Sequence, residues 1–342
     1  MSSPPRFSLR LPYGAATAAA LVALLTGCGS GSSAGSTSVA ATSGGKTQVS
    51  VAAQAGAPFT AVTIDVPQVD AIRAKVPKSI LDSGELKIGI GALPAGFPPL
   101  AFVGNDQKSL TGAEPDFGRL VAAVLGLKPT VSNATWENLF VGFDSGRTDV
   151  GFSNITDTEK RKEKYDFASY RQDNLGFEVN KASTWNFDGK YENLAGLRVS
   201  VSRGTNQEKI LLEWKAKLEA AGKKLDLLYF PDQNSISLAL NSGKIDTYFG
   251  PNPGIAYRVS QSKGKPTETR NAGTWSGAGE SLQGLIAATT KKGSGLAEPV
   301  ADAINYLIEH GQYATWLKAY NLENEAVKKS EVNPPGLPLT NS

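Results

Sequence analysis

The sequence predicts an α/β protein whose folded part consists of two lobes with a ligand cleft between them. Short strand-like segments alternate with helix-like segments from residue 85 to 152, and the same alternation returns from 197 to 249. Such alternation is typical of parallel sheets covered by helices. The chain has 342 residues, 40% of them hydrophobic, which is enough for two cores. Two such lobes place a cleft at the carboxyl ends of their strands.

In the first lobe, residues 86–90 alternate like a half-buried strand. Apolar residues at helical spacing follow over 117–125, and Gly126 stands where a helix would stop. Residues 136–143 predict a short helix and residues 149–152 a further strand.

In the second lobe, a strand at 198–201 precedes a helix that opens at Gly204, Thr205 and Asn206. The later elements are a strand at 225–230, a helix at 235–240, a strand at 247–249 and two closing helices at 299–309 and 313–320. The segment 136–150 also parallels the segment 234–247: each has a short helix, a Ser-Gly-basic turn and an Asp before a strand. The two lobes are therefore expected to share a local architecture.

These patterns give the domain boundaries. We assign residues 77–178 and 277–325 to lobe 1, residues 179–276 to lobe 2 and residues 326–342 to a C-terminal tail. Hinge strands are expected near 174–180 and 282–288, which makes lobe 1 discontinuous.

Composition excludes several classes of function. Lys and Arg number 35 against 32 Asp and Glu, and the whole excess of +3 lies in residues 1–76. The remainder is neutral and has no basic footprint for nucleic acid. One Cys and one His, His310, exclude a disulfide framework and leave too few ligands for a typical zinc site. We expect no metal and no cofactor.

The N-terminus has the features of an export signal. Arg6 and Arg10 precede an apolar run at 14–25, which is too short to span a bilayer comfortably. The run ends in Leu-Thr-Gly-Cys28, which resembles the lipobox of bacterial lipoproteins. This resemblance implies that residues 1–27 are a signal peptide and that Cys28 is lipidated, anchoring the protein to the outer face of the cell membrane.

Residues 28–76 are assigned to a lipidated flexible tether. Gly, Ser, Thr and Ala dominate residues 29–57, and such a segment cannot bury enough apolar surface to offset its ordering entropy. Residues 58–76 fit either the tether or a short packed extension.

Four segments in order carry a resemblance to a known family. They are Gly-Phe-Pro-Pro-Leu-Ala-Phe at 96–102, the start of the first helix at 110–116, Ser-Asn-Ile-Thr-Asp-Thr-Glu-Lys-Arg at 153–161 with Asp-Phe at 166–167, and the strand and Gly-Thr turn at 198–208. With these segments the chain from about residue 80 to 322 resembles the bacterial extracellular solute-binding proteins of the polar amino-acid family (family 3), the receptor subunits of ABC importers.

The resemblance implies a periplasmic-binding-protein-like fold of type II and a monomeric extracytoplasmic receptor. Its ligand would be a small polar carboxylate, with an amino acid as the first expectation, and its partners the ABC permease subunits in the membrane. A hinge motion would close the two lobes on the ligand.

The resemblance also implies site residues. Arg161 would bind the ligand carboxylate with its guanidinium, aided by the backbone N–H groups of Thr205 and Asn206 after Gly204. The alternative for Arg161 is a solvated charge in the run EKRKEKYD. Thr156 would line the cleft, and with Glu159 it also fits a capping box.

Two aromatic residues, Phe97 and Trp136, match positions that sandwich the ligand, although ordinary core packing remains open for both. Asn154 matches a family Ser that accepts a ligand hydrogen bond, and its amide oxygen could do the same.

One departure concerns the ammonium group of an amino acid. Family members usually carry an Asp shortly after the Gly-x-x-Asp-x-x-x strand of lobe 2, where this chain has Pro251 or Asn252. Asn252 is a weaker partner for an ammonium group than a carboxylate. Either a carboxylate elsewhere replaces it, or the ligand lacks an ordinary α-ammonium group. The candidate carboxylates are Glu114, Asp157 and Glu280.

Two other functions share this fold class. A periplasmic dehydratase-like enzyme would need a proton donor in the cleft, and Asp157, Glu159 and Glu114 are the available acids. A ligand-sensing module of a signalling receptor would need a membrane-spanning segment, and no such segment is expected after residue 322. We therefore expect a binding protein rather than an enzyme.

Overall fold

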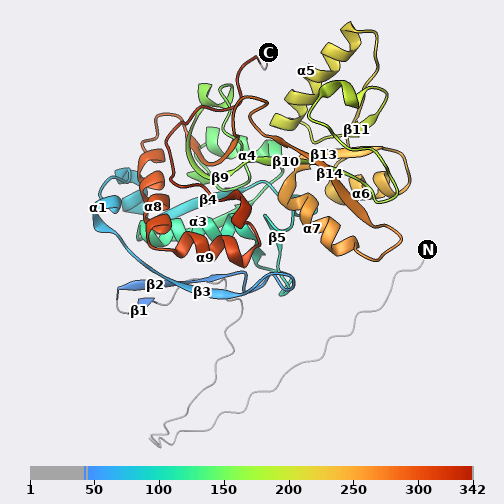
Figure 1. Ribbon diagram of the computed structural model, residues 1–342. Coiled ribbons are helices and arrows are strands. Elements are labelled where there is room, and N and C mark those ends of the chain that lie inside the picture. Colours follow the sequence, from blue (N-terminus) through green and yellow to red (C-terminus); the bar gives the residue numbers. More distant parts are fainter. Residues whose placement is uncertain (1–41, 44, 341–342) are drawn as a thin grey trace, which may run out of the picture. The chain divides into compact units, whose positions relative to one another are not determined.

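The computed structural model describes residues 42, 43 and 45–340 (Figure 1). The predicted signal peptide and Cys28 lie outside these residues. Among the described residues, no helix combines the length and the apolar character needed to cross a bilayer.

The first lobe is built on a five-stranded sheet of order β7-β4-β8-β15-β9. The strands are β4 (Glu85–Ile90), β7 (Lys128–Asn133), β8 (Val150–Gly151), β9 (Tyr165–Gln172) and β15 (Leu285–Lys291). β4 runs parallel to β7 and β8, whereas β15 is antiparallel to β8 and β9.

Helices cover this sheet on both faces (Figure 1). They are α1 (Asp70–Arg73), α2 (Lys78–Ser83), α3 (Ala113–Val124), α4 (Trp136–Asp144), α8 (Ala297–Glu309) and α9 (Gln312–Ala319). Every residue of α3 is buried, and Phe117 stacks on Trp316 of α9 with ring centroids 4.1 Å apart. A short hairpin of β5 (Phe102–Val103) and β6 (Leu110–Thr111) precedes α3.

The second lobe is built on a sheet of order β12-β11-β13-β10-β14. Its strands are β10 (Asn174–Asn180), β11 (Arg198–Ser200), β12 (Asp226–Leu228), β13 (Thr247–Pro251) and β14 (Thr269–Ser276). Its helices are α5 (Asn206–Ala220), α6 (Gln233–Asn241) and α7 (Asn252–Ser262), and its core contains Phe177, Trp214 and Phe249.

The parallel between segments 136–150 and 234–247 is real in three dimensions. α4 and α6 each end in a turn with a left-handed glycine, Gly146 and Gly243. In each lobe the Asp that follows accepts a backbone N–H from the neighbouring strand: Asp149 from Lys87 at 2.9 Å, and Asp246 from Arg198 at 2.8 Å. The carboxylate therefore fixes the same strand-to-strand junction twice.

The chain passes from β9 straight into β10 and returns between β14 and β15. β10 pairs with β13 and β14 from residue 174 onward. The predicted lobe border between 178 and 179 thus falls inside a strand of the second sheet. One continuous extended segment serves both sheets, so no turn signal marks the border.

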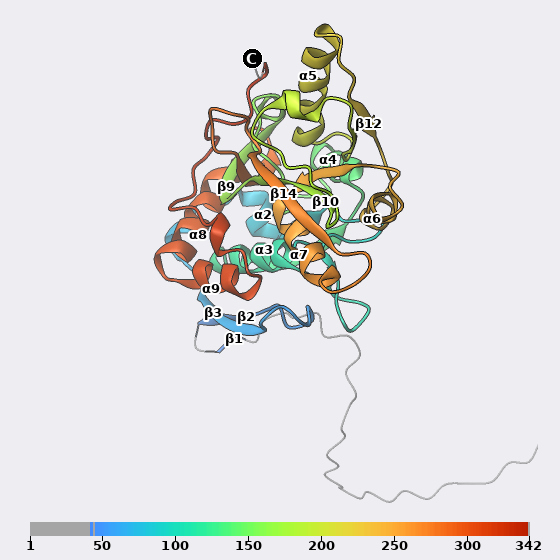
Figure 2. The ribbon, with the colours of Figure 1, turned by 45° about the vertical axis from the view of Figure 1, so that its right-hand side comes forward.

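The predicted tether is wrong for residues 46–57, and for residues 58–76 the structure shows the alternative, a packed extension. β2 (Lys46–Val51) and β3 (Val62–Pro67) form an antiparallel hairpin, with β1 (Thr42–Ser43) beside β2. Val49, Val51, Ile64 and Val66 alternate into the core of the first lobe. Figures 1 and 2 show this hairpin beside α9 and α3. The apolar alternation covers only short strands, and these lie among many Ser, Thr and Ala residues. The composition of the segment therefore predicted a tether instead of strands.

The predicted C-terminal tail is also packed. Val332 forms a bridge to Ala168 of β9, and Leu337 forms one to Thr158. Leu337 is buried in the core cluster of the second lobe, and Lys209 of α5 donates to the Pro338 carbonyl. Residues 332–338 therefore join the two lobes.

Candidate functional site

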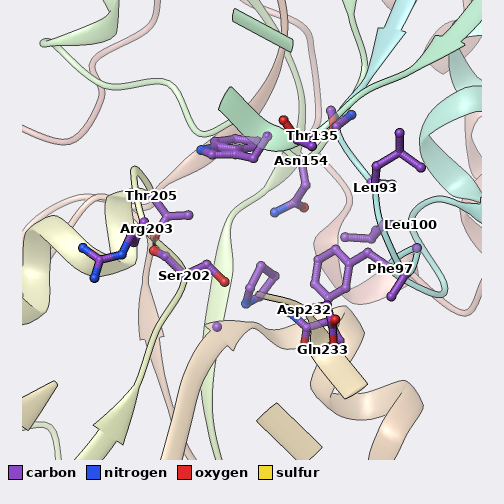
Figure 3. Close-up of a pocket in the computed structure, with 18 of the residues that line it drawn as sticks. Leu93, Phe97, Leu100, Thr135, Asn154, Ser202, Arg203, Thr205, Asp232 and Gln233 are labelled. Carbon is purple, nitrogen blue, oxygen red and sulfur yellow. Dashed lines mark hydrogen bonds between the residues drawn. The ribbon is translucent and has the colours of Figure 1, made fainter. Parts of the chain in front are cut away.

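A cavity of about 480 Å³ lies between the two lobes, and both contribute to its wall (Figure 3). This volume is in the range of sites for small organic ligands. The first lobe supplies, among others, Leu93, Phe97, Leu100, Glu114, Thr135, Trp136 and Asn154. The second lobe supplies, among others, Ser202, Arg203, Thr205, Asn206, Asp232, Gln233 and Tyr248. We call these two sets together the cavity wall.

Two aromatic side chains of the first lobe reach the second lobe at the cavity. Trp136 begins α4, which Thr135 caps by accepting the Asn138 N–H, and its Nε1 donates to the Gly204 carbonyl at 3.2 Å. Phe97 lies against Gly254 of α7, where a Cβ would stand only 2.4 Å from the ring. Both predicted sandwich residues thus line the cavity and also hold the lobes together.

Asn154 lines the cavity in a left-handed conformation with φ of 51°. Its Oδ1 accepts from Nη2 of Arg171 at 2.7 Å. A guanidinium can only donate, so the amide oxygen is fixed toward Arg171 and the NH₂ group remains for the cavity. Asn154 therefore presents a donor to the cavity, and acceptance of a ligand hydrogen bond by the second lone pair of its oxygen stays a prediction.

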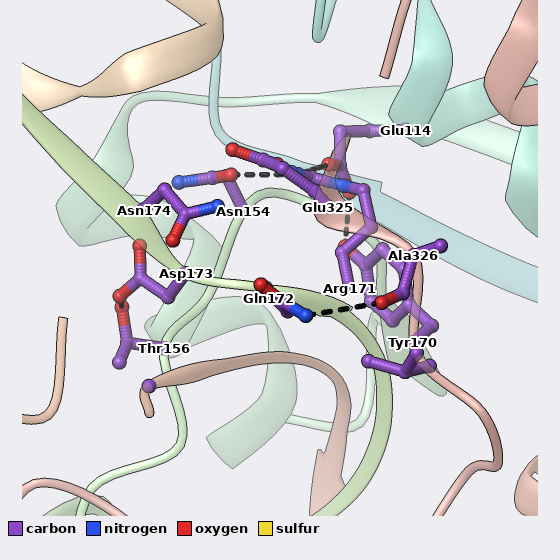
Figure 4. Close-up of polar contacts among 12 residues, drawn as sticks. Glu114, Asn154, Thr156, Tyr170, Arg171, Gln172, Asp173, Asn174, Glu325 and Ala326 are labelled. Carbon is purple, nitrogen blue, oxygen red and sulfur yellow. Dashed lines mark hydrogen bonds and ion pairs between the residues drawn. The ribbon is translucent and has the colours of Figure 1, made fainter. Parts of the chain in front are cut away.

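Beneath Asn154 lies a buried ion-pair group (Figure 4). Arg171 donates to Glu114 at 2.6 Å and also pairs with Glu325. Tyr170 donates its hydroxyl hydrogen to Glu114 as well. Burial raises the pKa of Glu325 to about 7, with the Arg171 charge opposing the rise. Glu114 lines the cavity, but its carboxylate is already engaged, so it is a weak substitute for the missing ammonium partner.

Four residues form what we call the hinge cluster: Thr156, Arg161, Asp173 and Asn206, the last of which also belongs to the cavity wall. Thr156 Oγ1 donates to Asp173 Oδ2 at 2.7 Å, and Asn206 Nδ2 donates to the same oxygen at 3.0 Å (Figure 4 shows the Thr156 contact). Asp173 stands at the junction of β9 and β10 and is 1% exposed. Burial raises the pKa of Asp173. Hydrogen bonds from Thr156 and Asn206 oppose this rise, as do the positive charges of Arg171 and Arg161.

Arg161 is half-buried and does not line the cavity. It donates to the Thr156 carbonyl at 2.8 Å and to the Gly204 carbonyl at 3.3 Å, and its guanidinium lies 5.3 Å from the Trp136 ring centroid. Burial lowers its pKa to about 10, while the negative charges of Asp173 and Asp157 oppose this effect. The solvated-charge alternative therefore does not describe Arg161, and its contact with a ligand carboxylate stays a prediction.

The expected capping box of Thr156 and Glu159 does not form. Thr158 instead accepts the backbone N–H of Arg161 at 3.1 Å at the start of a short 3₁₀ turn (Arg161–Glu163). The Thr156 hydroxyl is used by Asp173.

The N-terminus of α5 borders the cavity from the second lobe. Thr205 caps the helix by accepting the Glu208 N–H, and Glu208 in turn accepts the Gly204 N–H at 2.7 Å. Thr205 and Asn206 line the cavity, whereas Gly204 does not. Within the described part of the chain, the backbone N–H groups of Thr205 and Asn206 have no acceptor.

Asn252 lies outside this cavity. Its Oδ1 accepts from Asn271 at 2.8 Å, and it lines a second cavity of about 460 Å³ together with Asn174 and Glu280. Pro251 lines the main cavity instead. Asn252 is the first residue of α7, and it lines the second cavity instead of the main one.

The sequence reasoning missed Asp232, Gln233 and Tyr248. Asp232 caps α6 by accepting the Ser235 N–H at 2.8 Å, as Thr135 caps α4. Gln233 donates to the Tyr248 hydroxyl at 3.1 Å, and burial raises the Tyr248 pKa. The internal similarity of the two lobes could have predicted the first two of these residues, because the start of α6 corresponds to the start of α4, where Thr135 and Trp136 line the cavity.

No group of three or more His, Cys, Asp or Glu side chains in residues 42–43 and 45–340 is arranged to hold a metal ion. The site offers aromatic faces, amide donors and carboxylates, which suit recognition of a small polar molecule.

Two lobes joined by two crossing segments, with a cavity between them, define a two-lobed solute-binding protein. Residues 88–323 match the profile of the bacterial extracellular solute-binding proteins, family 3, and the chain belongs to this family. The expected family and fold class are thereby confirmed.

The chain is 26% identical over 267 residues to the arginine-binding protein ArgT of Corynebacterium glutamicum, covering 78% of this chain and 83% of that protein. It is 30% identical over 168 residues to the L-cystine-binding protein TcyJ of Escherichia coli, covering 49% and 59% respectively. A crystal structure of a mutant ArgBP from T. maritima has a TM-score of 0.60 at 21% identity, covering 71% of this chain and 98% of that one.

Proposed function

We propose that this protein is the extracytoplasmic receptor of an ABC importer and that it captures an amino acid or a closely related small polar solute. The observation that carries the proposal is the main cavity, whose wall comes from both lobes of a family 3 solute-binding fold. The arginine-binding and cystine-binding relatives support the solute class.

Capture follows from contacts that exist only when the lobes meet. Trp136 donates to Gly204, and Phe97 packs on Gly254, so both contacts require closure of the cavity. A solute that touches both walls favours this closed state because it gains contacts there that the open state lacks. The permease would then recognise the closed receptor.

The cavity wall supplies distinct roles. Phe97 and Trp136 present aromatic faces to the apolar part of the solute. The Asn154 NH₂ group and the N–H groups of Thr205 and Asn206 donate hydrogen bonds. Arg161 supports closure by holding the Gly204 carbonyl, in addition to its predicted role toward a ligand carboxylate.

Calorimetric titration of the chain without its predicted signal peptide, against amino acids and related amines, tests the proposal. We expect saturable binding of at least one solute, and ligand at 100 Kd should raise the unfolding free energy by about 2.7 kcal/mol. Asn154→Leu should weaken binding about tenfold, whereas Leu238→Ala, at a 70% exposed site on α6, should not change it. The absence of binding to every solute would contradict the proposal.

We also propose that Cys28 carries the lipid anchor. The lipobox-like sequence before Cys28 and the extracytoplasmic family support this. Cys28→Ser should move the protein from the membrane fraction to the soluble fraction, and retention of the variant in the membrane would contradict anchoring.

The dehydratase-like alternative has less support. His310 is exposed, stacks on Tyr306 and does not line the cavity. Glu114 is engaged by Arg171 and Tyr170. We therefore expect binding without turnover, and conversion of a bound solute would contradict this expectation.

A further inference from the structure

Two side chains at the expected carboxylate site already bind a carboxylate of the chain itself, that of Asp173. Thr156 from the first lobe and Asn206 from the second both donate to Asp173 Oδ2, at 2.7 and 3.0 Å. Arg161 uses its two terminal nitrogens on the Thr156 and Gly204 carbonyls. The Arg161 guanidinium and the side chains of Thr156 and Asn206 are thus committed within the chain, whereas the two backbone N–H groups at the start of α5 have no acceptor among the described residues.

Asp173 is held firmly in this position. Its N–H donates to the Gly284 carbonyl at 2.7 Å, and its carbonyl accepts from Gly277 at 2.9 Å. Its carboxylate lies on Gly277, where a Cβ would stand only 1.7 Å from Oδ2. A side chain anchored at the junction of two sheets cannot easily move aside for a ligand.

The N-terminus of α5 is likewise supplied with negative charge by the chain. Glu208 accepts the Gly204 N–H, and Asp173 accepts from the side-chain amide of Asn206, the first residue of the helix. These two carboxylates complement the positive end of the helix dipole. A ligand carboxylate placed there would meet Asp173 at close range, and like charges repel.

The cavity wall is suited to a cation instead. Phe97 and Trp136 offer aromatic faces, which attract cations, and Trp136 already has the Arg161 guanidinium 5.3 Å from its ring centroid. Asp232 uses Oδ1 to cap α6, and its Oδ2 has no hydrogen bond to any described residue. Arg203, the basic side chain in the wall, stacks 3.8 Å from the Tyr229 ring centroid and extends away from Phe97 and Asn154 (Figure 3).

We propose that Asp173 stands in for the ligand carboxylate, so that the solute is a small organic cation without a carboxylate: an amine or a guanidine that Asp232 and the aromatic faces bind. This inference rests on the proposed function and specifies its solute class. Asp173 acts as a specificity-determining residue because it fills a position that a carboxylate ligand would need.

The test uses pairs of compounds that differ in the carboxylate alone: arginine with agmatine, lysine with cadaverine, and ornithine with putrescine. Calorimetry on the wild-type protein should show at least one amine bound tenfold or more tightly than its amino acid. Asp173→Ser, which removes the carboxylate and leaves space, should shift this ratio at least tenfold toward the amino acid. Asp173→Asn keeps the volume and should shift it less.

Asp232→Asn should weaken amine binding about tenfold, whereas Asp82→Asn, at an exposed site on α2, should leave it unchanged. If the Asp173 variants do not fold, these two variants and the comparison of compounds on the wild-type protein still test the inference. Equal binding, or preference for the amino acid of every pair, would overturn this inference and leave the proposed function standing. No binding of either member of any pair would also overturn this inference, and the proposed function would fall only if the wider titration found no solute at all.

Discussion

The hinge cluster and the cavity wall lie at the same interface between the lobes, yet they use their polar groups in opposite ways. In the hinge cluster, Thr156 and Asn206 donate to Asp173. In the cavity wall, the NH₂ group of Asn154 and Oδ2 of Asp232 remain for a solute. The first region joins the lobes, and the second recognises what lies between them.

A residue that matches a family motif does not always have hydrogen-bonding groups free to bind a solute. Thr156 and Arg161 stand in a family-like segment, but neither lines the cavity. A neighbour that no motif marked, Asp173, satisfies the Thr156 hydroxyl. Four variants separate the structural region from the recognition region.

Arg171→Ala should have the largest effect on stability. The substitution leaves Glu114 and Glu325 buried without their cation, a change that typically costs about 3–5 kcal/mol. Urea unfolding measures it. The control, Arg198→Ala, breaks a partly exposed pair with Asp246 and should cost about 1 kcal/mol or less. Equal effects would contradict the structural role of the buried group.

Asp157→Asn should change how stability depends on pH. Burial raises the Asp157 pKa to about 7, and this rise is opposed by Lys162, whose Nζ lies 3.4 Å from Asp157 Oδ1. Between about pH 4 and 7 the folded state therefore holds a proton that the unfolded state has lost, so ionisation destabilises the fold as pH rises.

The Asn variant lacks this titration. Relative to the wild type, its unfolding free energy should increase by about 3 kcal/mol between pH 4.5 and pH 8. Urea titrations at the two pH values measure the gain. A difference that does not vary with pH would show that Asp157 ionises normally.

Phe97→Ala should affect recognition more than folding. It removes an aromatic face of the cavity wall and the contact with Gly254, so solute affinity should fall about tenfold. Calorimetry measures this, and Val103→Ala, at an exposed site in the β5–β6 hairpin, is the control. Unchanged affinity would remove Phe97 from the recognition region.

Phe59→Ala should have the smallest effect. Phe59 follows β2 and stacks on Tyr257 of α7 with ring centroids 5.7 Å apart, and it also contacts Phe102 and Tyr320. It thus joins the N-terminal hairpin to the second lobe, outside the cavity. We expect a loss of about 1 kcal/mol in unfolding free energy and a drop in affinity of no more than about threefold. A tenfold drop would place this contact in the recognition region.

Much of the fold could be predicted from periodicity. The strand expected at 86–90 is β4, and the helices expected at 136–143 and 299–309 are α4 and α8. These elements bury one face, so their apolar residues repeat at the spacing of a strand or helix. β10 and β15 were found only as expected hinge strands, because strands buried on both faces show no alternation.

The candidate site was only partly predictable. Phe97, Trp136, Asn154, Thr205, Asn206 and Glu114 do line the cavity, whereas Arg161, Thr156, Gly204 and Asn252 do not. Local sequence places a residue on an element, but it does not say which distant group occupies its side chain. The Asn154 amide is turned by Arg171, seventeen residues away.

The sequence by itself determined the α/β class, the duplicated helix-turn-strand junction and the family, because these depend on local spacing along the chain. Only the tertiary structure decided that the terminal segments pack on the lobes and that Asp173 meets Thr156 and Asn206. Those contacts join residues far apart in sequence across two sheets, and burial rather than local propensity selects them.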